Sequence, residues 1–405
     1  MKKNALLLGC VLLLIFGTCF LAVASSSLPM KKKLIEYGWD RPSPDYVAAN
    51  ITEMEKRPFD GIIMKLAGKG QGKIFSGGKW NLADYAADFE ALEKINWNKF
   101  TDNFIMMYAA SDMDWFSDQN WNNIVNNLKI MTKAAKAGRC NLAFDPEPYG
   151  KNPWRYDQQL HADTKSFSDY QAKVRQRGAQ FIQAIQKDLP KTVLLTLFTY
   201  SIFPDIADPI KREQALRQNH YGLYPAFLTG IMDAMGPGIT MTDGNEPSYY
   251  YTNSEQFYTA YHRMRQTSLN LIPPDNIDTF SLQTQASQAL YFDHLFAKRP
   301  KQPKEKILSN FMTEQEQLKW WEHNVYYALK TSDEYIWLYS NHINWWKDEG
   351  LPDGMEDAII SARDKIAQQK PLGFNIDKII ANAQKKQREA KETKEMTTET
   401  NKTEN

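Results

Sequence analysis

Short apolar runs alternate with longer segments of helical period along most of the chain. The run FDGIIMKL is followed by a glycine-rich loop and by LADYAADFEALEKI, and NFIMMYAA is followed by NWNNIVNNLKIMTKAAKAG. Apolar runs of about four to eight residues are typical of buried strands, and apolar residues three and four positions apart are typical of a helix face. The pattern predicts β-strands that alternate with α-helices.

Eight such strand–helix units fit within residues 33–380. This order favours the α/β class and a single (β/α)₈ TIM barrel with elaborated βα loops over a doubly wound sheet, although the seventh unit could be miscounted. The predicted strands lie in the runs LIEYGW, FDGIIMKL, NFIMMYAA, CNLAFDPE, TVLLTLFTY, GITMTD, ALYFDHLF and EYIWLYSN.

The two ends of the chain fall outside the predicted barrel. Residues 1–24 combine a lysine pair, a long apolar run and the small-residue site AVA, which is typical of a cleaved signal peptide and predicts a secreted, periplasmic or cell-surface protein. An uncleaved membrane anchor, or a lipid anchor at Cys10 in LLGC, is the alternative and would be the only link to a membrane. Residues 384–405 contain almost nothing apolar and predict a solvated, disordered tail.

Charge and metal-binding residue types narrow the function. The 49 basic and 48 acidic residues nearly cancel, and the barrel has no basic stripe, so we expect no nucleic-acid partner. The six histidines are scattered, so no metal and no cofactor is predicted. Cys140 is the one cysteine beyond the signal segment, which indicates a buried, unpaired thiol. The oligomeric state stays open.

The stretch AFDPEPYG, residues 143–150, places two carboxylates where the predicted fourth strand ends. Catalytic groups of such barrels lie at the carboxyl ends of the strands, and side chains two positions apart share one face of a strand. Asp145 and Glu147 should therefore both face the mouth of the barrel. The alternative is that they cap the next helix or bind a backbone turn.

Further acids follow other predicted strands. Glu36 and Asp40 share one face of the first strand, and Asp243 and Glu246 follow the sixth strand in TDGNEPSYYY. Each could be an ordinary loop acid. Crowded carboxyl groups raise one another's pKa and separate into a protonated acid and an ionised partner, so their convergence at one rim indicates acid–base chemistry.

Aromatic residues concentrate in the same predicted loops. Some of them must pack in the loop core, while others suit a carbohydrate site, because a sugar ring stacks its apolar face on an aromatic ring. A carbohydrate is therefore the expected partner. The aromatic residues that follow the predicted strands are Trp39, Trp80, Trp115, Tyr149, Trp154, Tyr249, Tyr250, Tyr251, Trp345 and Trp346.

An exported (β/α)₈ barrel with D-x-E at the end of strand four resembles glycoside hydrolases, and FDPEPYG is similar to the end of the chitinase-type motif at Asp145 and Glu147. MTDGN loosely resembles the strand-six M-T-Y-D motif at Asp243, and Trp337 resembles the tryptophan under the bound sugar. The full four-acid motif is absent, because Asn141 and Ala143 stand where further acids would be. The resemblance implies the superfamily and leaves the family open.

The resemblance implies hydrolysis of a glycosidic bond by two carboxyl groups. Glu147 would protonate the leaving oxygen, and Asp145 would tune and orient Glu147. Asp243 or Glu246 would act as nucleophile, base or charge stabiliser. A carbohydrate-binding barrel that has lost turnover is the rival function, since it needs only the aromatic and neutral polar groups. The sugar-binding residues predicted beside these acids are Glu36, Trp39, Asp40, Trp115, Tyr149, Trp154, Tyr249, Tyr250, Trp337 and Trp345.

Overall fold

A computed structural model describes residues 32–203, 206, 208 and 210–403 of the chain. The predicted signal peptide at 1–24, with its anchor alternatives, lies outside the described residues. Among the residues that are described, no helix combines the length and apolar character needed to cross a membrane.

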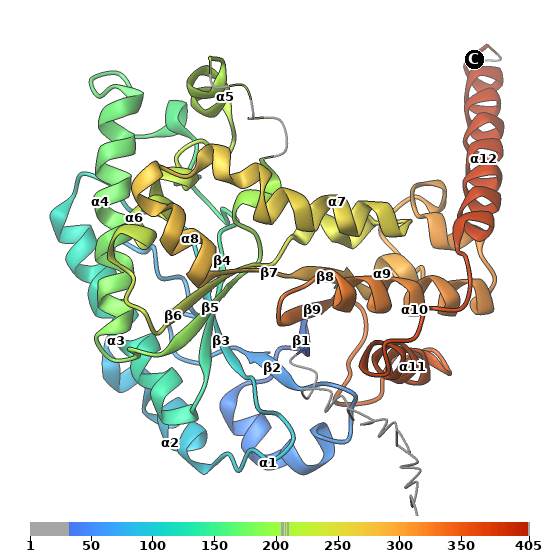
Figure 1. Cartoon of the computed structure of the whole chain (residues 1–405), viewed down its shortest axis with the longest axis horizontal. Helices are drawn as coiled ribbons and strands as arrows, with labels where there is room; N and C mark the ends of the chain where they lie inside the picture. The colour runs from blue at the N-terminus through green and yellow to red at the C-terminus, as the bar shows by residue number, and fades with distance from the viewer. Residues whose placement is uncertain (1–31, 204–205, 207, 209, 404–405) are drawn as a thin grey trace, which may run out of the picture. The chain divides into compact units, whose positions relative to one another are not determined.

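Nine parallel strands form one sheet, in the order β7-β6-β5-β4-β3-β2-β1-β9-β8 (Figure 1). Each neighbouring pair is hydrogen-bonded in parallel register, as βα units require. The strands are β1 (Lys33–Gly38), β2 (Gly61–Met64), β3 (Phe104–Tyr108), β4 (Asn141–Asp145), β5 (Thr192–Thr196), β6 (Ile239–Asp243), β7 (Thr284–Ala286), β8 (Gln288–Tyr291) and β9 (Tyr335–Ser340).

The two edge strands of this order are consecutive in the chain, because only Ser287 separates β7 from β8. The Ser287 N–H donates to the backbone oxygen of Asp243 in β6 (2.8 Å), while β8 pairs with β9. Together β7 and β8 fill the place of one strand and close a barrel-like sheet. The predicted seventh strand was wrong in its bounds: the strand region begins at Thr284, and residues 292–295 of ALYFDHLF form a short helix.

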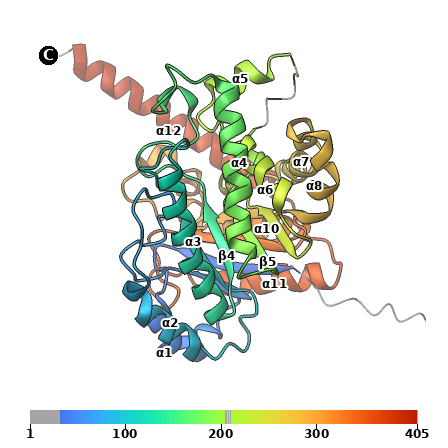
Figure 2. The same ribbon diagram turned by 90° about the vertical axis from the view of Figure 1, so that its left-hand side faces the viewer.

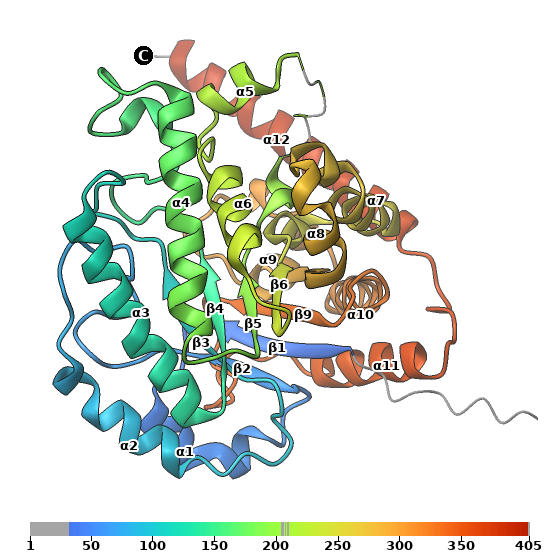
Figure 3. The same ribbon diagram turned by 60° about the vertical axis from the view of Figure 1, so that its left-hand side comes forward.

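Helices that follow the strands lie outside the sheet, as the amphipathic segments predict (Figure 1). Figure 2 shows α4 between α3 and α6, and α10 packs against α11 (Figure 3). The helices are α1 (Pro44–Met54), α2 (Ala86–Lys94), α3 (Asp118–Gly138), α4 (Phe167–Gln186), α5 (Arg212–Gln218), α6 (Tyr224–Ala234), α7 (Ser254–Arg265), α8 (Ile277–Gln283), α9 (Phe292–Leu295), α10 (Glu314–Lys330), α11 (Met355–Ala367) and α12 (Asp377–Thr403).

Two glycines allow α4 and α6 to pack with their backbones in contact. A Cβ atom on Gly178 would lie 2.1 Å from the Phe227 oxygen, and one on Gly230 would lie 1.8 Å from the Arg175 oxygen. Any larger residue would push the helices apart.

The predicted disordered tail at 384–405 is wrong for most of its length, because residues 377–403 form α12. The segment is rich in Ala, Lys, Glu, Gln and Arg, which are strong helix formers, and its first turns bury Ile380 and Ala383. Gln387 also donates to the backbone oxygen of Glu305 (3.0 Å). Low hydrophobicity indicated disorder, but helix propensity and this anchoring favour a helix.

Candidate active site

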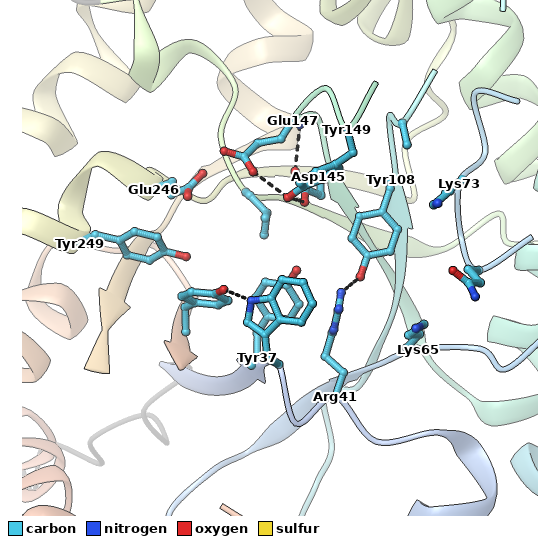
Figure 4. A pocket seen from close by; sticks show the side chains of 16 residues that line it. Tyr37, Arg41, Lys65, Lys73, Tyr108, Asp145, Glu147, Tyr149, Glu246 and Tyr249 are labelled. Atoms are coloured by element: carbon cyan, nitrogen blue, oxygen red, sulfur yellow. Dashed lines mark hydrogen bonds between the residues drawn. The ribbon is translucent and has the colours of Figure 1, made fainter. Parts of the chain in front are cut away.

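A cavity of about 370 Å³ lies at the carboxyl ends of the strands (Figure 4). Its size is typical of a small-ligand site. Carboxyl groups and cationic side chains line opposite parts of its wall, with aromatic rings between them. The lining includes the acids Asp145, Glu147 and Glu246, the cations Arg41, Lys65 and Lys73, and the aromatic residues Tyr37, Trp39, Tyr108, Tyr149, Tyr249 and Tyr339.

The β4 motif forms a compact turn that holds its two acids together. The Glu147 N–H donates to Asp145 Oδ1 (2.9 Å), so the turn is closed by the first carboxylate. The Tyr149 hydroxyl lies 2.8 Å from Asp145 Oδ2 and 2.6 Å from Glu147 Oε2. One hydroxyl has one proton, so a proton on one of the two carboxyl groups is needed for both contacts to be hydrogen bonds.

The electrostatics of the site place a proton among its acids near neutral pH. Burial, followed by the charge of Glu147, raises the pKa of Asp145 to about 7. Burial, followed by the charges of Glu147 and Asp145, raises the pKa of Glu246 to about 8. Burial and the adjacent carboxylates also raise the pKa of Tyr149, so its hydroxyl stays protonated. The three acids therefore form one coupled cluster.

Glu246 reaches the cavity because the chain turns sharply after β6. Asn245 has a left-handed backbone (φ 46°), a conformation that asparagine tolerates better than most residues. Its side chain donates to Gln288 Oε1 (2.7 Å), and the Glu246 N–H donates to the Leu197 oxygen (3.1 Å). These contacts fix the turn and direct Glu246 toward Glu147 (Figure 4).

Asp243, the other acid predicted after the sixth strand, is a structural residue here. Its carboxylate accepts five hydrogen bonds, from the backbone N–H and hydroxyl groups of Thr199 and Ser201 and from the Asn245 N–H, at 2.6–3.1 Å. It is buried and does not line the cavity. Asp243 thus ties the loop after β5 to the end of β6, and Glu246 is the strand-six acid that lines the cavity.

The acids of β1 lie below the cavity instead of lining it. Glu36 is fully buried, and burial together with Asp40 raises its pKa well above the usual range. Burial raises the pKa of Asp40 to about 6, and its Oδ2 accepts from the Trp345 N–H (2.9 Å). This pair joins β1 to the loop after β9, so the predicted sugar contacts of Glu36 and Asp40 are not supported.

Most of the tryptophans predicted to bind sugar belong to the core. Trp115, Trp154, Trp337 and Trp345 are fully buried, so their rings cannot stack on a ligand. Each of these four tryptophans packs against another aromatic ring. The position of a tryptophan in a loop after a strand does not reveal such packing. Trp39, by contrast, is 63% exposed and lines the cavity.

The tyrosines divide in the same way. Tyr149 and Tyr249 line the cavity as predicted, whereas Tyr250 is half exposed but packs beside His294 outside it. Tyr249 stacks on Tyr339 with ring centroids 5.7 Å apart. Trp337 lies behind Tyr249 and donates from Nε1 to the Gly244 oxygen (2.9 Å). Trp337 therefore supports the cavity wall from within.

Two buried tryptophans hold the loop that carries the β4 acids. Trp154 Nε1 donates to the oxygen of Pro146, between Asp145 and Glu147 (2.7 Å). Trp115 Nε1 donates to the Pro153 oxygen (2.8 Å). Their role is to position the turn.

We expect Trp154→Phe to keep most of the packing but leave the Pro146 oxygen without its donor, which costs about 1–2 kcal/mol of folding stability. Turnover per folded molecule should also fall once a substrate is known, because the acids lose their support. Trp97→Phe is the matched control, since Trp97 Nε1 donates to the Gly138 oxygen (2.8 Å) away from the cavity. Equal turnover in both variants would contradict the positioning role.

Sequence reasoning missed the cationic wall of the cavity. Arg41 follows β1, Lys65 follows β2, and Lys73 belongs to GKGQGK in the glycine-rich loop predicted after the second strand. That loop is fixed against β3, where the Tyr108 N–H donates to the Gly72 oxygen (2.8 Å). The positions of Arg41 and Lys65 just after strands were the available signal.

Cys140 is buried and unpaired, and burial raises the pKa of its thiol to about 12, as the predicted inert thiol requires. Across the described part of the chain, no group of three or more His, Cys, Asp or Glu side chains could hold a metal ion.

No protein-family model matches the chain, and no curated protein matches its sequence. Solved structures of low identity share the general architecture. A broad-specificity endoglucanase from Clostridium longisporum is 10% identical, with 83% of this chain and 97% of that chain covered and a TM-score of 0.45. A sugar phosphate isomerase/epimerase described as putative, from Anabaena variabilis, is 13% identical, with 83% and 99% covered and a TM-score of 0.39.

An O-GlcNAc hydrolase mutant of Thermobaculum terrenum is 9% identical and covers 89% of this chain, with a TM-score of 0.41. The match spans 63% of that protein's length. Hydrolases and an isomerase occur together among these structures, so similarity at this level does not choose an activity. The function must be argued from the cavity itself.

Proposed function

We propose that the protein is a glycoside hydrolase that uses Glu147 and Glu246 as its pair of catalytic carboxyl groups. The observation that carries this proposal is that acids from the ends of β4 and β6 line one cavity, where the charges of Glu147 and Asp145 add to burial in raising the pKa of Glu246. Hydrolysis of a glycosidic bond uses two carboxyl groups, one on each side of the bond. The aromatic wall of Trp39 and Tyr249 suits the sugar rings.

Glu246 is the better proton donor of the two. Its pKa of about 8 keeps it protonated at neutral pH, as a general acid for the leaving oxygen must be. Glu147 accepts a hydrogen bond from the Tyr149 hydroxyl, and we assign it the role of nucleophile or base. The sequence-based prediction gave the proton to Glu147, and we propose the reverse assignment. Asp145 shares the Tyr149 hydroxyl and orients Glu147.

In the proposed reaction, Glu246 gives its proton to the glycosidic oxygen as the bond to the anomeric carbon breaks. Glu147 then stabilises the positive charge that develops at that carbon, either by direct attack or by removing a proton from an attacking water. In the first case water later releases the sugar, and Glu246 takes the water's proton. The first route returns both acids to their starting states. The second leaves Glu246 ionised and Glu147 protonated, so a proton must pass from Glu147 to Glu246 through solvent before the next turnover.

The pH dependence should follow Glu246. We expect kcat/KM to fall as pH rises through about 8, because Glu246 then loses the proton that it must donate. The apparent value belongs to the coupled cluster, in which Asp145 titrates near 7. Initial rates between about pH 5 and 10 test this, and a profile that stays flat through the alkaline range would exclude Glu246 as the donor.

A panel of polysaccharides and aryl glycosides tests the proposed function itself. Reducing-end release and ligand binding should be measured together on the purified chain. Release of sugar supports a hydrolase, whereas tight binding with no release from any member supports the carbohydrate-binding rival.

We also propose that the protein is exported, since residues 1–24 have the charged start, apolar run and small-residue site of a signal peptide. N-terminal mass spectrometry of the mature protein should find a start near residue 25. A mature chain that retains residues 1–24 would contradict cleavage.

A further inference from the structure

The cavity has a basic side opposite its acids. Arg41, Lys65 and Lys73 come from three separate segments, the loop after β1, the end of β2 and the loop that follows it. In Figure 4 they lie across the cavity from Glu147 and Glu246. Neutral polar groups are sufficient to recognise sugar hydroxyl groups, whereas three cations on one wall are matched by a negatively charged group on the ligand.

These three cations lie near one another, and although the charge of Arg41 acts on Asp145 and Glu36, none of the three forms a direct ion pair in the described part of the chain. The ion pairs found among the described residues include neither Arg41 nor Lys65 nor Lys73. Burial, followed by the charges of Arg41 and Lys73, lowers the pKa of Lys65. Like charges held together destabilise a protein unless a ligand neutralises them.

The acids of the cavity do not balance this charge. At neutral pH, Glu246 retains its proton because its pKa is about 8, and Asp145, with a pKa of about 7, is only partly ionised. Two lining acids, Asp145 and Glu147, therefore remain to face three cationic side chains. The cationic side chains lie on the side of the cavity away from the predicted proton donor (Figure 4).

Arg41 and the backbone of the Lys73 loop are held in place. Arg41 donates to the Tyr108 hydroxyl and stacks on Trp39, with its guanidinium carbon 5.0 Å from the ring centroid. The loop that carries Lys73 is fixed at its start by Asp88, which accepts from the Ala67 and Gly68 N–H groups at 2.9 and 3.0 Å. The preorganised Arg41 guanidinium favours binding, because less of its side-chain freedom is lost when a ligand arrives.

We propose that the substrate is an anionic glycan whose carboxylate or sulfate group binds between Arg41, Lys65 and Lys73 while the scissile bond lies between Glu147 and Glu246. This proposal rests on the glycoside hydrolase function proposed above and names its substrate class. A neutral sugar at the same position would remove water from three cations without compensating them, so the cavity discriminates against it.

Glucuronate, glucose 6-sulfate and glucose are suitable probes, because they compare a carboxylate, a sulfate ester and a neutral sugar on one ring. We expect at least one charged sugar to bind the full chain with a Kd roughly tenfold or more below that of glucose, measured by calorimetry. The difference should shrink in high salt. Which charged sugar binds better identifies the anion.

The variant Lys65→Gln/Lys73→Gln should lose this preference. Lys129→Gln/Lys187→Gln removes the same charge from two exposed positions outside the cavity, one on α3 and one directly after α4, and should retain the preference. Equal binding of charged and neutral sugars, no binding of either charged sugar, or an equal effect of both double variants would each overturn the proposal.

The same measurements on Glu147→Gln separate this inference from the proposed function. Anion-selective binding without hydrolysis of any acidic glycan would contradict the proposed hydrolase function and support the anion site. Hydrolysis of neutral glycans without anion selectivity would support the hydrolase function and contradict the anion site.

Discussion

Replacing Glu147 with glutamine is expected to lower turnover by at least roughly 10²- to 10⁴-fold while the protein stays folded and still binds its ligand. Glutamine keeps the size of the side chain and can still accept from the Tyr149 hydroxyl. It cannot attack the anomeric carbon or take a proton from water. The loss should be similar for substrates with good and poor leaving groups, because Glu147 acts on the sugar.

Glu255→Gln is the matched control, since Glu255 is exposed on α7 and lies outside the cavity. Turnover, ligand affinity and melting temperature should be measured on one preparation of each variant. A folded Glu147→Gln protein with the turnover of the control would remove Glu147 from the mechanism.

Glu246→Gln is expected to show a different pattern, because it removes the proton donor. Turnover of a natural glycan should fall roughly 10²- to 10⁴-fold, whereas an aryl glycoside, whose leaving group needs little protonation, should lose much less. The alkaline fall in kcat/KM should disappear as well. An equal loss for both substrates would assign the proton to another group, with Glu147 the first alternative.

The Glu246→Gln substitution should also increase the folding stability of the protein at pH values above the acidic range. Folding raises the pKa of Glu246 from 4.5 to about 8, so between these values the folded chain takes up a proton that the unfolded chain lacks. Its contribution to stability is complete below about pH 4.5 and is lost as pH rises through 8. Glutamine does not titrate, so its advantage should grow from pH 5 to 8, reaching on the order of a few kcal/mol.

Sequence patterns located the strands well because buried parallel strands are continuous apolar runs. They placed Asp145 and Glu147 in the cavity wall because side-chain direction in a strand follows from position alone. The choice between Asp243 and Glu246 depended on the left-handed turn at Asn245 and on donors from the loop after β5. Neither feature can be derived from a short motif.

The tryptophans show a second limit of sequence reasoning. A ring that follows a strand can point into the cavity, as Trp39 does, or into the packing beneath the loop, as Trp154 does. The difference arises from distant partners such as Phe75, whose ring lies 5.7 Å from that of Trp154. The basic wall was missed for a related reason, since the direction of its side chains depends on the Tyr108 and Trp39 rings and on the fold of the glycine-rich loop.

The most direct test of the two-carboxylate account compares the wild-type chain with Glu147→Gln/Glu246→Gln on the glycan that the wild type cleaves fastest. Reducing-end release and ligand affinity are measured on the same preparations. The account predicts that the wild type releases sugar and that the double variant loses at least as much activity as the more damaged of the two single variants. The ligand affinity should change little. Wild-type rates in the folded double variant would contradict it.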